Sequence, residues 1–168
     1  KQKKQQSTVD DTLAGFTEEN DDGTYNMQGA AVTIDNNTGY VVAIVGGRDQ
    51  DFNSYTLNRA FQSHRQPGSS IKPLIVYTPA FERGYDPNTI VDDHKFEGGP
   101  SNATNTYAGK IPLRYAVAKS LNTVAWQVYE QVTPKVGLQY LKNMNFSSIV
   151  KDEYTLATSL GGFTKGVS

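Results

Sequence analysis

The sequence predicts a domain of the α+β class, because strand signals dominate its first third and helix signals its second half. Two runs rich in β-branched residues, 28–35 and 40–46, flank the turn signal Asn36-Asn37-Thr38-Gly39 and predict a β-hairpin. From Leu113 onwards apolar residues recur at helical spacing, and Thr133-Pro134 is typical of a helix start. Since the second run is apolar on both faces, we expect its strand to be covered on both sides, as in the centre of a sheet packed against helices.

Composition and charge exclude several classes of protein. The chain has 168 residues, which suits one domain, and its formal net charge of −1 provides no basic field to attract nucleic acid. The absence of cysteine excludes a disulfide framework, a thiolate zinc site and a cysteine nucleophile. The longest uncharged runs, residues 73–81 and 120–129, are shorter than the ~18 apolar residues that a membrane span requires. We therefore expect neither a nucleic-acid partner nor a membrane span within these residues.

The other elements follow from local composition. Residues 1–26 are mostly polar and charged, so we expect a linker or an arm that precedes the domain and lies on a neighbouring one. A helix is predicted to begin at Ser69 or Ser70, directly after a Pro-Gly turn. Residues 85–110 show little periodicity and predict a long surface loop, whereas residues 151–160 predict one further helix.

The stretch Ser69-Ser70-Ile71-Lys72 is an S-x-x-K tetrad placed where a turn enters a helix. A hydroxyl and an amine three residues apart share one face of a helix, which is the geometry of a nucleophile with a neighbouring base. Lysine can accept the serine proton only if desolvation or nearby positive charge lowers its pKa. The free N–H groups of a helix start can also bind a developing oxyanion. The simpler alternative is that Ser69 is an ordinary helix cap.

The tetrad alone is weak evidence, because the sequence contains it twice. Ser148-Ile149-Val150-Lys151 also matches, but no turn precedes it and its lysine is expected to be exposed, so we interpret it as fortuitous. The first tetrad follows the Pro67-Gly68 turn, and Lys119-Ser120-Leu121-Asn122 comes about 50 residues later. That second element is an S-x-N motif. S-x-x-K and S-x-N are two of the three signatures of enzymes that bind penicillin through a serine.

With these motifs, residues 27–168 resemble the front part of the transpeptidase domain of class A, bifunctional penicillin-binding proteins. Further segments resemble that family in order and spacing: the hairpin, the stretch from Phe52-Asn53 to Asn58-Arg59-Ala60, residues 109–118 and residues 161–168. The resemblance implies a β-lactamase/transpeptidase-like fold, in which an antiparallel sheet is flanked by helices and a mostly helical lobe. This chain would supply only the first two strands and much of the helical part.

The resemblance also implies roles for four residues. Ser69 would be the acylated nucleophile, Lys72 its proton acceptor, Ser120 the hydroxyl that relays a proton to the leaving amine, and Asn122 a ligand for the substrate amide. For Ser120 and Asn122 the alternatives are a helix cap and a turn residue. The implied enzyme is a serine D,D-transpeptidase that cross-links peptidoglycan stem peptides ending in D-Ala-D-Ala and is blocked by β-lactams. It would need no cofactor.

The resemblance also implies a cellular location and further segments of the protein. It would work at the extracytoplasmic face of the bacterial cell membrane, anchored by a segment outside this chain, with a glycosyltransferase domain elsewhere in the protein. The third family signature, Lys-Thr-Gly, does not occur in the sequence, since Thr164-Lys165-Gly166 has the wrong order and lies in a glycine-rich segment. We therefore expect the remaining strands and the Lys-Thr-Gly motif on a further segment of the same domain.

The sequence leaves two alternative functions open and argues against a metal site. A β-lactamase-type hydrolase needs a base for the deacylating water, and the nearest match, Glu153-Tyr154-Thr155-Leu156-Ala157, lacks the asparagine of the Glu-x-x-Leu-Asn motif in class A β-lactamases. A penicillin-sensing or inactive binding domain would look similar in this region. His64 and the Asp92-Asp93-His94 cluster lack enough convergent ligands, so no metal is expected.

Overall fold

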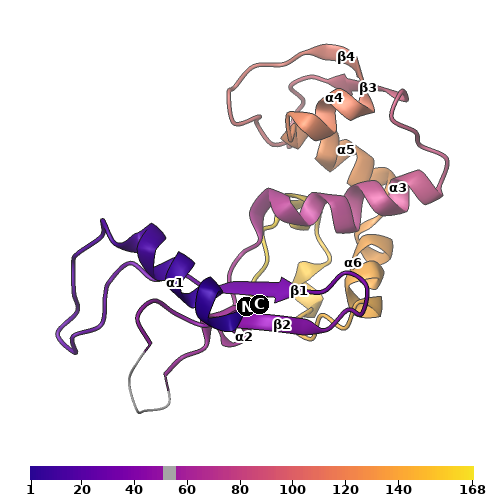
Figure 1. Cartoon of the computed structure of the whole chain (residues 1–168). Helices are drawn as coiled ribbons and strands as arrows, with labels where there is room; N and C mark the ends of the chain where they lie inside the picture. The colour runs from indigo at the N-terminus through magenta and orange to yellow at the C-terminus, as the bar shows by residue number, and fades with distance from the viewer. Residues whose placement is uncertain (51–55) are drawn as a thin grey trace. The chain divides into compact units, whose positions relative to one another are not determined.

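The computed structural model describes residues 1–50 and 56–168, which divide into two compact units. One unit comprises Lys1–His64 together with Ser168, and the other comprises Arg65–Val167 (Figure 1). The predicted family segment that begins at Phe52-Asn53 lies in part outside the described residues.

The first unit contains the predicted β-hairpin. Strand β1 (Ala31–Ile34) pairs antiparallel with β2 (Val41–Val45), so Ala31 faces Val45 and Thr33 faces Ala43. The connecting turn is closed by the Asp35 carbonyl, which accepts hydrogen bonds from the N–H groups of Thr38 and Gly39. A short helix, α2 (Arg59–Gln62), follows, and the Asn58 side chain caps its start.

The described residues cover the hairpin only in part. Ala43 and Val45 are buried, but Val41 is 56% exposed and Ile34 is 54% exposed. The described residues alone therefore do not cover the second strand on both sides, and its place inside a larger sheet stays a prediction. An apolar surface of this kind is what a sheet shows where further strands or helices are missing.

Residues 2–13 form a helix, α1 (Gln2–Leu13), that packs on β2 (Figure 1). The Gln2 side-chain amide both donates to the Ile44 carbonyl, at 2.6 Å, and accepts from the Ile44 N–H, at 2.9 Å. Gln5 accepts a hydrogen bond from the Thr33 hydroxyl of β1. The polar composition that predicts a linker thus also suits a helix whose glutamines bind backbone and hydroxyl groups of the hairpin, and the assignment of residues 1–26 as an arm stays a prediction.

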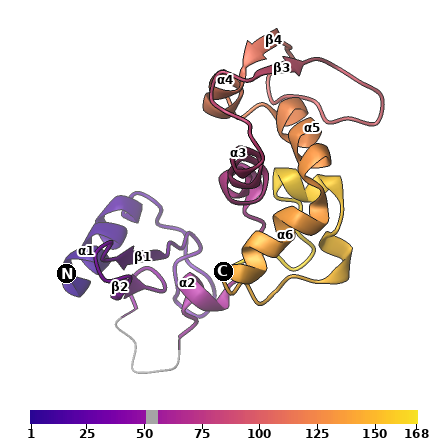
Figure 2. The same cartoon turned by 90° about the vertical axis from the view of Figure 1, so that its right-hand side faces the viewer.

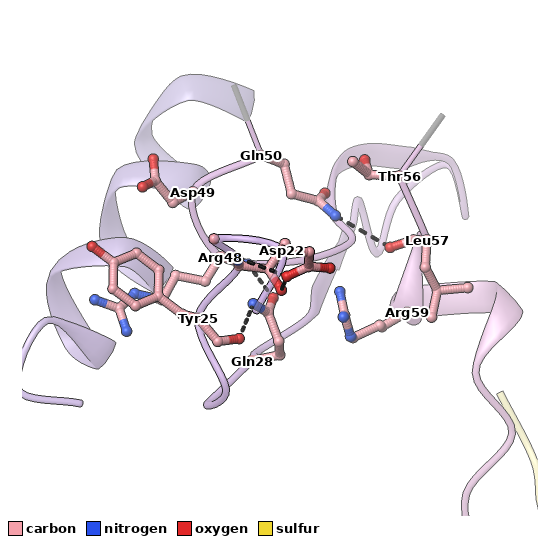
Figure 3. A pocket seen from close by; sticks show the side chains of 11 residues that line it. Asp22, Tyr25, Gln28, Arg48, Asp49, Gln50, Thr56, Leu57 and Arg59 are labelled. Carbon is pink, nitrogen blue, oxygen red and sulfur yellow. Dashed lines mark hydrogen bonds between the residues drawn. The ribbon is translucent and has the colours of Figure 1, made fainter. Parts of the chain in front are cut away.

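Arg48 holds residues 16–28, the segment between α1 and the hairpin, in place through several contacts. Its guanidinium donates to the Phe16 carbonyl and lies 3.6 Å from the centre of the Tyr25 ring. Its backbone N–H donates to Gln28, whose side chain in turn donates to the Tyr25 carbonyl (Figure 3). Arg48, Tyr25 and Gln28 line a cavity of about 260 Å³, which Arg59 also lines (Figure 3). Because the Arg48 charge is committed to these contacts, its role is structural.

The second unit is mostly helical, as predicted. Its elements, in chain order, are the 3₁₀ helix η1 (Gly68–Ile71), the π-helix η2 (Pro73–Tyr77), α3 (Thr78–Glu82), β3 (Ile90–Asp93), β4 (Gly109–Pro112), α4 (Leu113–Ala118), α5 (Asn122–Val132), α6 (Pro134–Asn143), and the 3₁₀ helices η3 (Lys151–Glu153) and η4 (Leu156–Leu160). The first three are continuous along the chain, so the predicted helix at Ser69 begins one residue earlier, at Gly68. No helix in the described part of the chain is both long enough and apolar enough for a membrane span.

A single apolar core holds the second unit together. Helix α5 buries Val124, Val128 and Val132 at four-residue spacing, the signature of a helix with one face against a core. Figure 2 shows α5 and α6 beside the helix that ends in α3. Close packing there depends on Gly137 of α6, where a Cβ atom would lie 2.6 Å from the Ile75 carbonyl oxygen. Only glycine allows the two helices to approach so closely.

A second two-stranded sheet interrupts the predicted long loop. Strands β3 and β4 pair antiparallel, with Val91 opposite Ile111, and both of these side chains pack against the core. The chain therefore supplies two more strands than predicted. Each strand has only four residues, and a long polar segment separates them. No local sequence pattern therefore predicts that they pair.

The predicted helix over residues 151–160 is two separate 3₁₀ helices. Glu153 ends η3 with its carboxylate turned inward, where both oxygens accept from the Thr164 N–H. The Thr158 hydroxyl donates to the Glu153 carbonyl, and Gly161 ends η4 in the left-handed conformation. These side-chain bonds compete with α-helical hydrogen bonding, which explains why the continuous helix does not form.

Candidate active site

The S-x-x-K tetrad lies on the tight turn that opens the long helix of the second unit. Gly68, in the left-handed region with φ +55°, turns the chain into η1, and the Lys72 N–H donates to the Ser69 carbonyl. Side chains at positions i and i+3 of a 3₁₀ helix eclipse one another, so Ser69 and Lys72 lie on the same face. Ser69 is exposed, and its hydroxyl makes no hydrogen bond to any described residue. The hydroxyl of neighbouring Ser70 instead donates to the Pro67 carbonyl at 2.7 Å.

The end of the chain braces this turn from the side. Arg65 and Val167 form an antiparallel bridge with two backbone hydrogen bonds of 2.9 and 2.8 Å. The Gln66 side chain donates to the Phe163 carbonyl. Gly161 approaches so closely that a Cβ atom there would lie 2.2 Å from the Gly68 carbonyl oxygen. Thr164-Lys165-Gly166 belongs to this brace and forms no strand, in agreement with its exclusion as a Lys-Thr-Gly motif.

Lys72 joins the two motifs. Its ammonium nitrogen donates to the Ser120 carbonyl at 2.8 Å, to the Ser120 hydroxyl at 3.2 Å and to Asn122 Oδ1 at 2.8 Å. The residue is only 2% exposed, and burial lowers the pKa of Lys72 to about 8. At neutral pH a minor fraction of the amine is therefore unprotonated and able to accept a proton. The structure thus brings Lys72, Ser120 and Asn122 together one turn beyond Ser69.

Ser120 occupies a backbone position that normally suits glycine. Helix α4 ends in a Schellman motif, in which the Leu121 N–H donates to the Ala116 carbonyl and the Ser120 N–H to the Val117 carbonyl. Ser120 itself adopts φ +52°, in the left-handed region. A side chain costs about 1 kcal/mol there. The predicted alternative, that Ser120 caps the next helix, does not describe this position, because Leu121 is the residue that precedes α5.

We expect Ser120→Gly to stabilise the protein and Ser120→Ala not to do so. Both changes remove the hydroxyl, but only glycine relieves the left-handed strain, by about 1 kcal/mol. Thermal unfolding of the two variants measures this difference, and a domain of this size should melt about 2–4 °C higher with glycine than with alanine. Equal melting temperatures would show that Ser120 is unstrained.

Asn122 is held on two sides. Its Oδ1 accepts from Lys72, and its Nδ2 donates to the Ser101 carbonyl at 2.9 Å. Its backbone N–H donates to Asn102 Oδ1 at 2.8 Å. The amide therefore presents its oxygen to the lysine in a fixed orientation.

Sequence reasoning missed Asp93 and Asn102, which lie behind Asn122. Asp93 is 1% exposed, and its carboxylate accepts from Asn102 Nδ2, the Thr123 hydroxyl and the Ala108 N–H. Burial acts to raise the pKa of Asp93, but these three hydrogen bonds and nearby His94 outweigh it and lower the pKa below the ordinary value.

In the Asp92-Asp93-His94 cluster the first and third side chains are exposed to solvent and the second is buried. Asp92 and His94 lie 3.6 Å apart at the surface, while Asp93 points inward. In the described part of the chain no group of His, Asp and Glu side chains is arranged to hold a metal ion. The alternation of a β-strand, which ends at Asp93, is the one local signal that could have placed Asp93 on the inner face.

A cavity of about 310 Å³ adjoins the S-x-N motif. It is lined by Ser120 and Lys119 from one side and by Thr104, Thr106 and Tyr107 from the loop between β3 and β4. Space of this size beside a serine hydroxyl can hold a small polar group of a ligand.

Comparison with known proteins assigns the chain to a family. The sequence model of the family described as "Penicillin binding protein transpeptidase domain" matches residues 29–166. The chain belongs to this family, which confirms the resemblance seen in the two motifs and the segments around them.

Two relatives and one solved structure illustrate the likeness. The chain is 35% identical over 147 residues to penicillin-binding protein 4 of Bacillus subtilis (strain 168), covering 85% of this chain and 23% of that protein. It is 39% identical over 132 residues to penicillin-binding protein 1A of Neisseria meningitidis (strain Z2491), covering 73% and 16% respectively. The fold matches that of PonA1 from Mycobacterium tuberculosis in complex with penicillin V, with a TM-score of 0.70 and 21% identity over 94% of this chain and 44% of that one. The chain thus spans a quarter or less of the two relatives' length.

Proposed function

We propose that this chain is the front part of a serine D,D-transpeptidase domain, with Ser69 as the nucleophile. The observation that carries the proposal is the hydrogen-bonded cluster of Lys72 with Ser120 and Asn122, one turn from an exposed serine at a helix entrance. The substrate would be a peptidoglycan stem peptide that ends in D-Ala-D-Ala, and β-lactams would acylate the same serine. No metal or cofactor enters the proposal.

The chemistry follows from the positions of these groups. Unprotonated Lys72 accepts the Ser69 proton as the hydroxyl oxygen attacks the carbonyl carbon between the two D-alanines. When the tetrahedral intermediate collapses, the C–N bond breaks and the Ser120 hydroxyl passes a proton from Lys72 to the departing D-Ala amine. The amine of a second stem peptide then attacks the carbonyl carbon of the acyl-enzyme ester. As the new C–N bond forms and the C–O bond to Ser69 breaks, Ser120 and Lys72 pass the proton lost by the amine to the Ser69 oxygen, which frees the serine. Asn122 binds the amide of the donor throughout.

The β-lactamase-type alternative is disfavoured by the state of Glu153. A deacylating base must bind a water molecule, but the Glu153 carboxylate is 1% exposed and both of its oxygens accept from the Thr164 N–H. Glu153 therefore acts as a brace for the segment behind Gly68. A penicillin-sensing domain would share the acylation step, so only turnover with substrate separates it from an enzyme.

We infer that a further segment of the same domain completes the site. The exposed apolar side chains of the hairpin and the absence of Lys-Thr-Gly from the sequence support this view. The segment would add strands and a Lys-Thr-Gly motif for the substrate carboxylate. The complete protein would act at the extracytoplasmic face of the bacterial membrane, with its anchor and a glycosyltransferase domain outside this chain.

The test is to supply the complete protein with a donor peptide ending in D-Ala-D-Ala and an amine acceptor. Mass spectrometry follows release of D-alanine and formation of the new amide, while a fluorescent penicillin reports acylation and its reversal. We expect release of D-alanine together with formation of the amide product. We also expect a penicillin adduct whose lifetime is much longer than the time the enzyme needs for one reaction with the peptide.

Each alternative predicts a different result. Rapid release of hydrolysed penicillin would identify a β-lactamase. A persistent adduct with no reaction of any donor peptide would identify a sensing domain. Either result would overturn the transpeptidase proposal.

A further inference from the structure

The start of helix α5 is capped by a side chain from a distant loop. Its N-cap residue, Leu121, has no side-chain acceptor for the free N–H groups of the first turn. Asn102, on the loop between β3 and β4, supplies it instead: Asn102 Oδ1 accepts from the Asn122 N–H at 2.8 Å and from the Thr123 N–H at 3.4 Å. The position of Asn122 therefore depends on which way the Asn102 amide points.

Asp93 decides that orientation. A carboxylate only accepts hydrogen bonds, so the group of Asn102 that faces it must be the NH₂. Asn102 Nδ2 donates to Asp93 Oδ1 at 2.7 Å and to the Thr106 carbonyl at 3.0 Å. With its nitrogen committed to these two acceptors, Asn102 must turn its oxygen toward α5. Asp93 also accepts directly from the Thr123 hydroxyl, which ties the same turn a second time.

Among the described residues the Asp93 carboxylate forms no ion pair, and its three hydrogen-bond donors are neutral groups, so burying it costs more than burying a neutral amide. The Asp93 carboxylate therefore fixes the direction of hydrogen bonds in this loop at a cost in stability. It links the end of β3 to the loop at Asn102, the loop to the first turn of α5, and that turn to Lys72 through Asn122 Oδ1.

We propose that Asp93 is a positioning residue for the acylation step: by orienting Asn102 it holds Asn122 where its Oδ1 meets the Lys72 amine. The proposal rests on the proposed function, because it concerns the same site. Asp93 touches neither Lys72 nor the reacting atoms, so its effect passes through Asn102 and Thr123.

The test exchanges the two interacting groups in the complete protein. Asp93→Asn removes the demand for a donor and lets the Asn102 amide turn over, while Asn102→Asp places two carboxylates against each other. The double variant D93N/N102D restores the donor–acceptor pair between the two residues in reverse and keeps an oxygen facing the N–H groups of α5. It does not restore the bond from position 102 to the Thr106 carbonyl, so recovery should be partial. Asp92→Asn is the matched control, because the same change one residue earlier affects only the surface pair with His94.

We expect each single variant to be acylated by penicillin about tenfold more slowly, the loss expected for one hydrogen bond to a charged group. The double variant should be faster than either single variant, and Asp92→Asn should match the unmodified protein. Melting temperatures measured alongside separate the two roles. A merely structural residue would lower the rate only near the melting temperature, and the exchange would not restore it.

Amide hydrogen exchange provides a readout that needs no penicillin. The N–H groups of Asn122 and Thr123 should exchange at least about tenfold faster in Asp93→Asn, well below the melting temperature, because local opening of the α5 start becomes easier. Unchanged exchange, single variants that keep the full rate, or a double variant no faster than the singles would each overturn the inference. An unmodified protein that penicillin does not acylate would overturn the proposed function, and hydrogen exchange would still decide whether Asp93 holds the turn.

Discussion

Ser69→Ala should abolish covalent labelling of the complete protein by a fluorescent penicillin. The hydroxyl oxygen is the atom that forms the ester, so its removal leaves no bond to make, whatever else binds the drug. Ser69 is exposed and has no hydrogen bond to a described residue, so the change should leave the melting temperature nearly unaltered. Labelling measured on a denaturing gel, with thermal unfolding alongside, checks both expectations.

The second S-x-x-K tetrad supplies the control. Ser148 lies in a turn and Lys151 is exposed, so this pair lacks the buried amine and the S-x-N partner that surround Ser69. Ser148→Ala should be labelled like the unmodified protein. Labelling that survives Ser69→Ala, or that disappears with Ser148→Ala, would assign the nucleophile elsewhere.

Lys72→Met should slow acylation by about 100- to 10,000-fold, the range over which a positioned acid or base acts. Methionine keeps much of the length of the side chain but removes the amine that joins the two motifs. The rate constant for penicillin acylation measures the loss. Lys151→Met, which makes the same change in the second tetrad, should leave the rate unchanged, and a Lys72→Met variant of normal rate would exclude Lys72 as the base.

The pH dependence of the unmodified protein should carry the signature of the same amine. Burial lowers the pKa of Lys72 to about 8, and only the unprotonated amine can accept the serine proton. The acylation rate should therefore rise with pH and level off above about 8. A rate that falls as pH rises through 8 would mean that the protonated form of Lys72 is the active one.

Stability should follow the same titration. The folded state gives up the Lys72 proton at a lower pH than the unfolded chain, whose lysine has a pKa of 10.5. Between about 8 and 10.5 the unfolded state binds more protons, so this group makes the free energy of unfolding rise with pH in that window. Lys72→Met should remove that contribution, which urea unfolding at several pH values can measure.

The sequence was most informative where the signal is local. The hairpin follows from two β-branched runs around a turn, and the helix at Ser69 follows from the Pro-Gly turn before it. Spacing alone predicted that Ser69 and Lys72 share one face, whereas Ser120 and Asn122 were selected through the family resemblance. That Lys72 and Asn122 touch each other was expected only from the family resemblance, since 50 residues separate them along the chain.

What local patterns could not predict depends on contacts between distant segments. The pairing of β3 with β4 joins two short strands across a polar loop, and a strand of four residues has too few alternations to stand out. Asp93 and Asn102 are polar residues of kinds that are common in loops, and only the folded chain shows that they face the start of α5. The left-handed backbone of Ser120 could not be predicted either. Glycine is the residue that usually occupies such a position, and serine gives no local signal for it.

The glutamine side chain that lies along β2 has a bearing on how the hairpin can grow. Gln2 uses both hydrogen-bonding groups of Ile44, in the way that a neighbouring strand would, and so closes that border of the two-stranded ribbon. A strand added along β2 would have to displace Gln2 from Ile44. One side-chain amide near the beginning of the sequence therefore favours growth of the sheet at its other edge, beside β1.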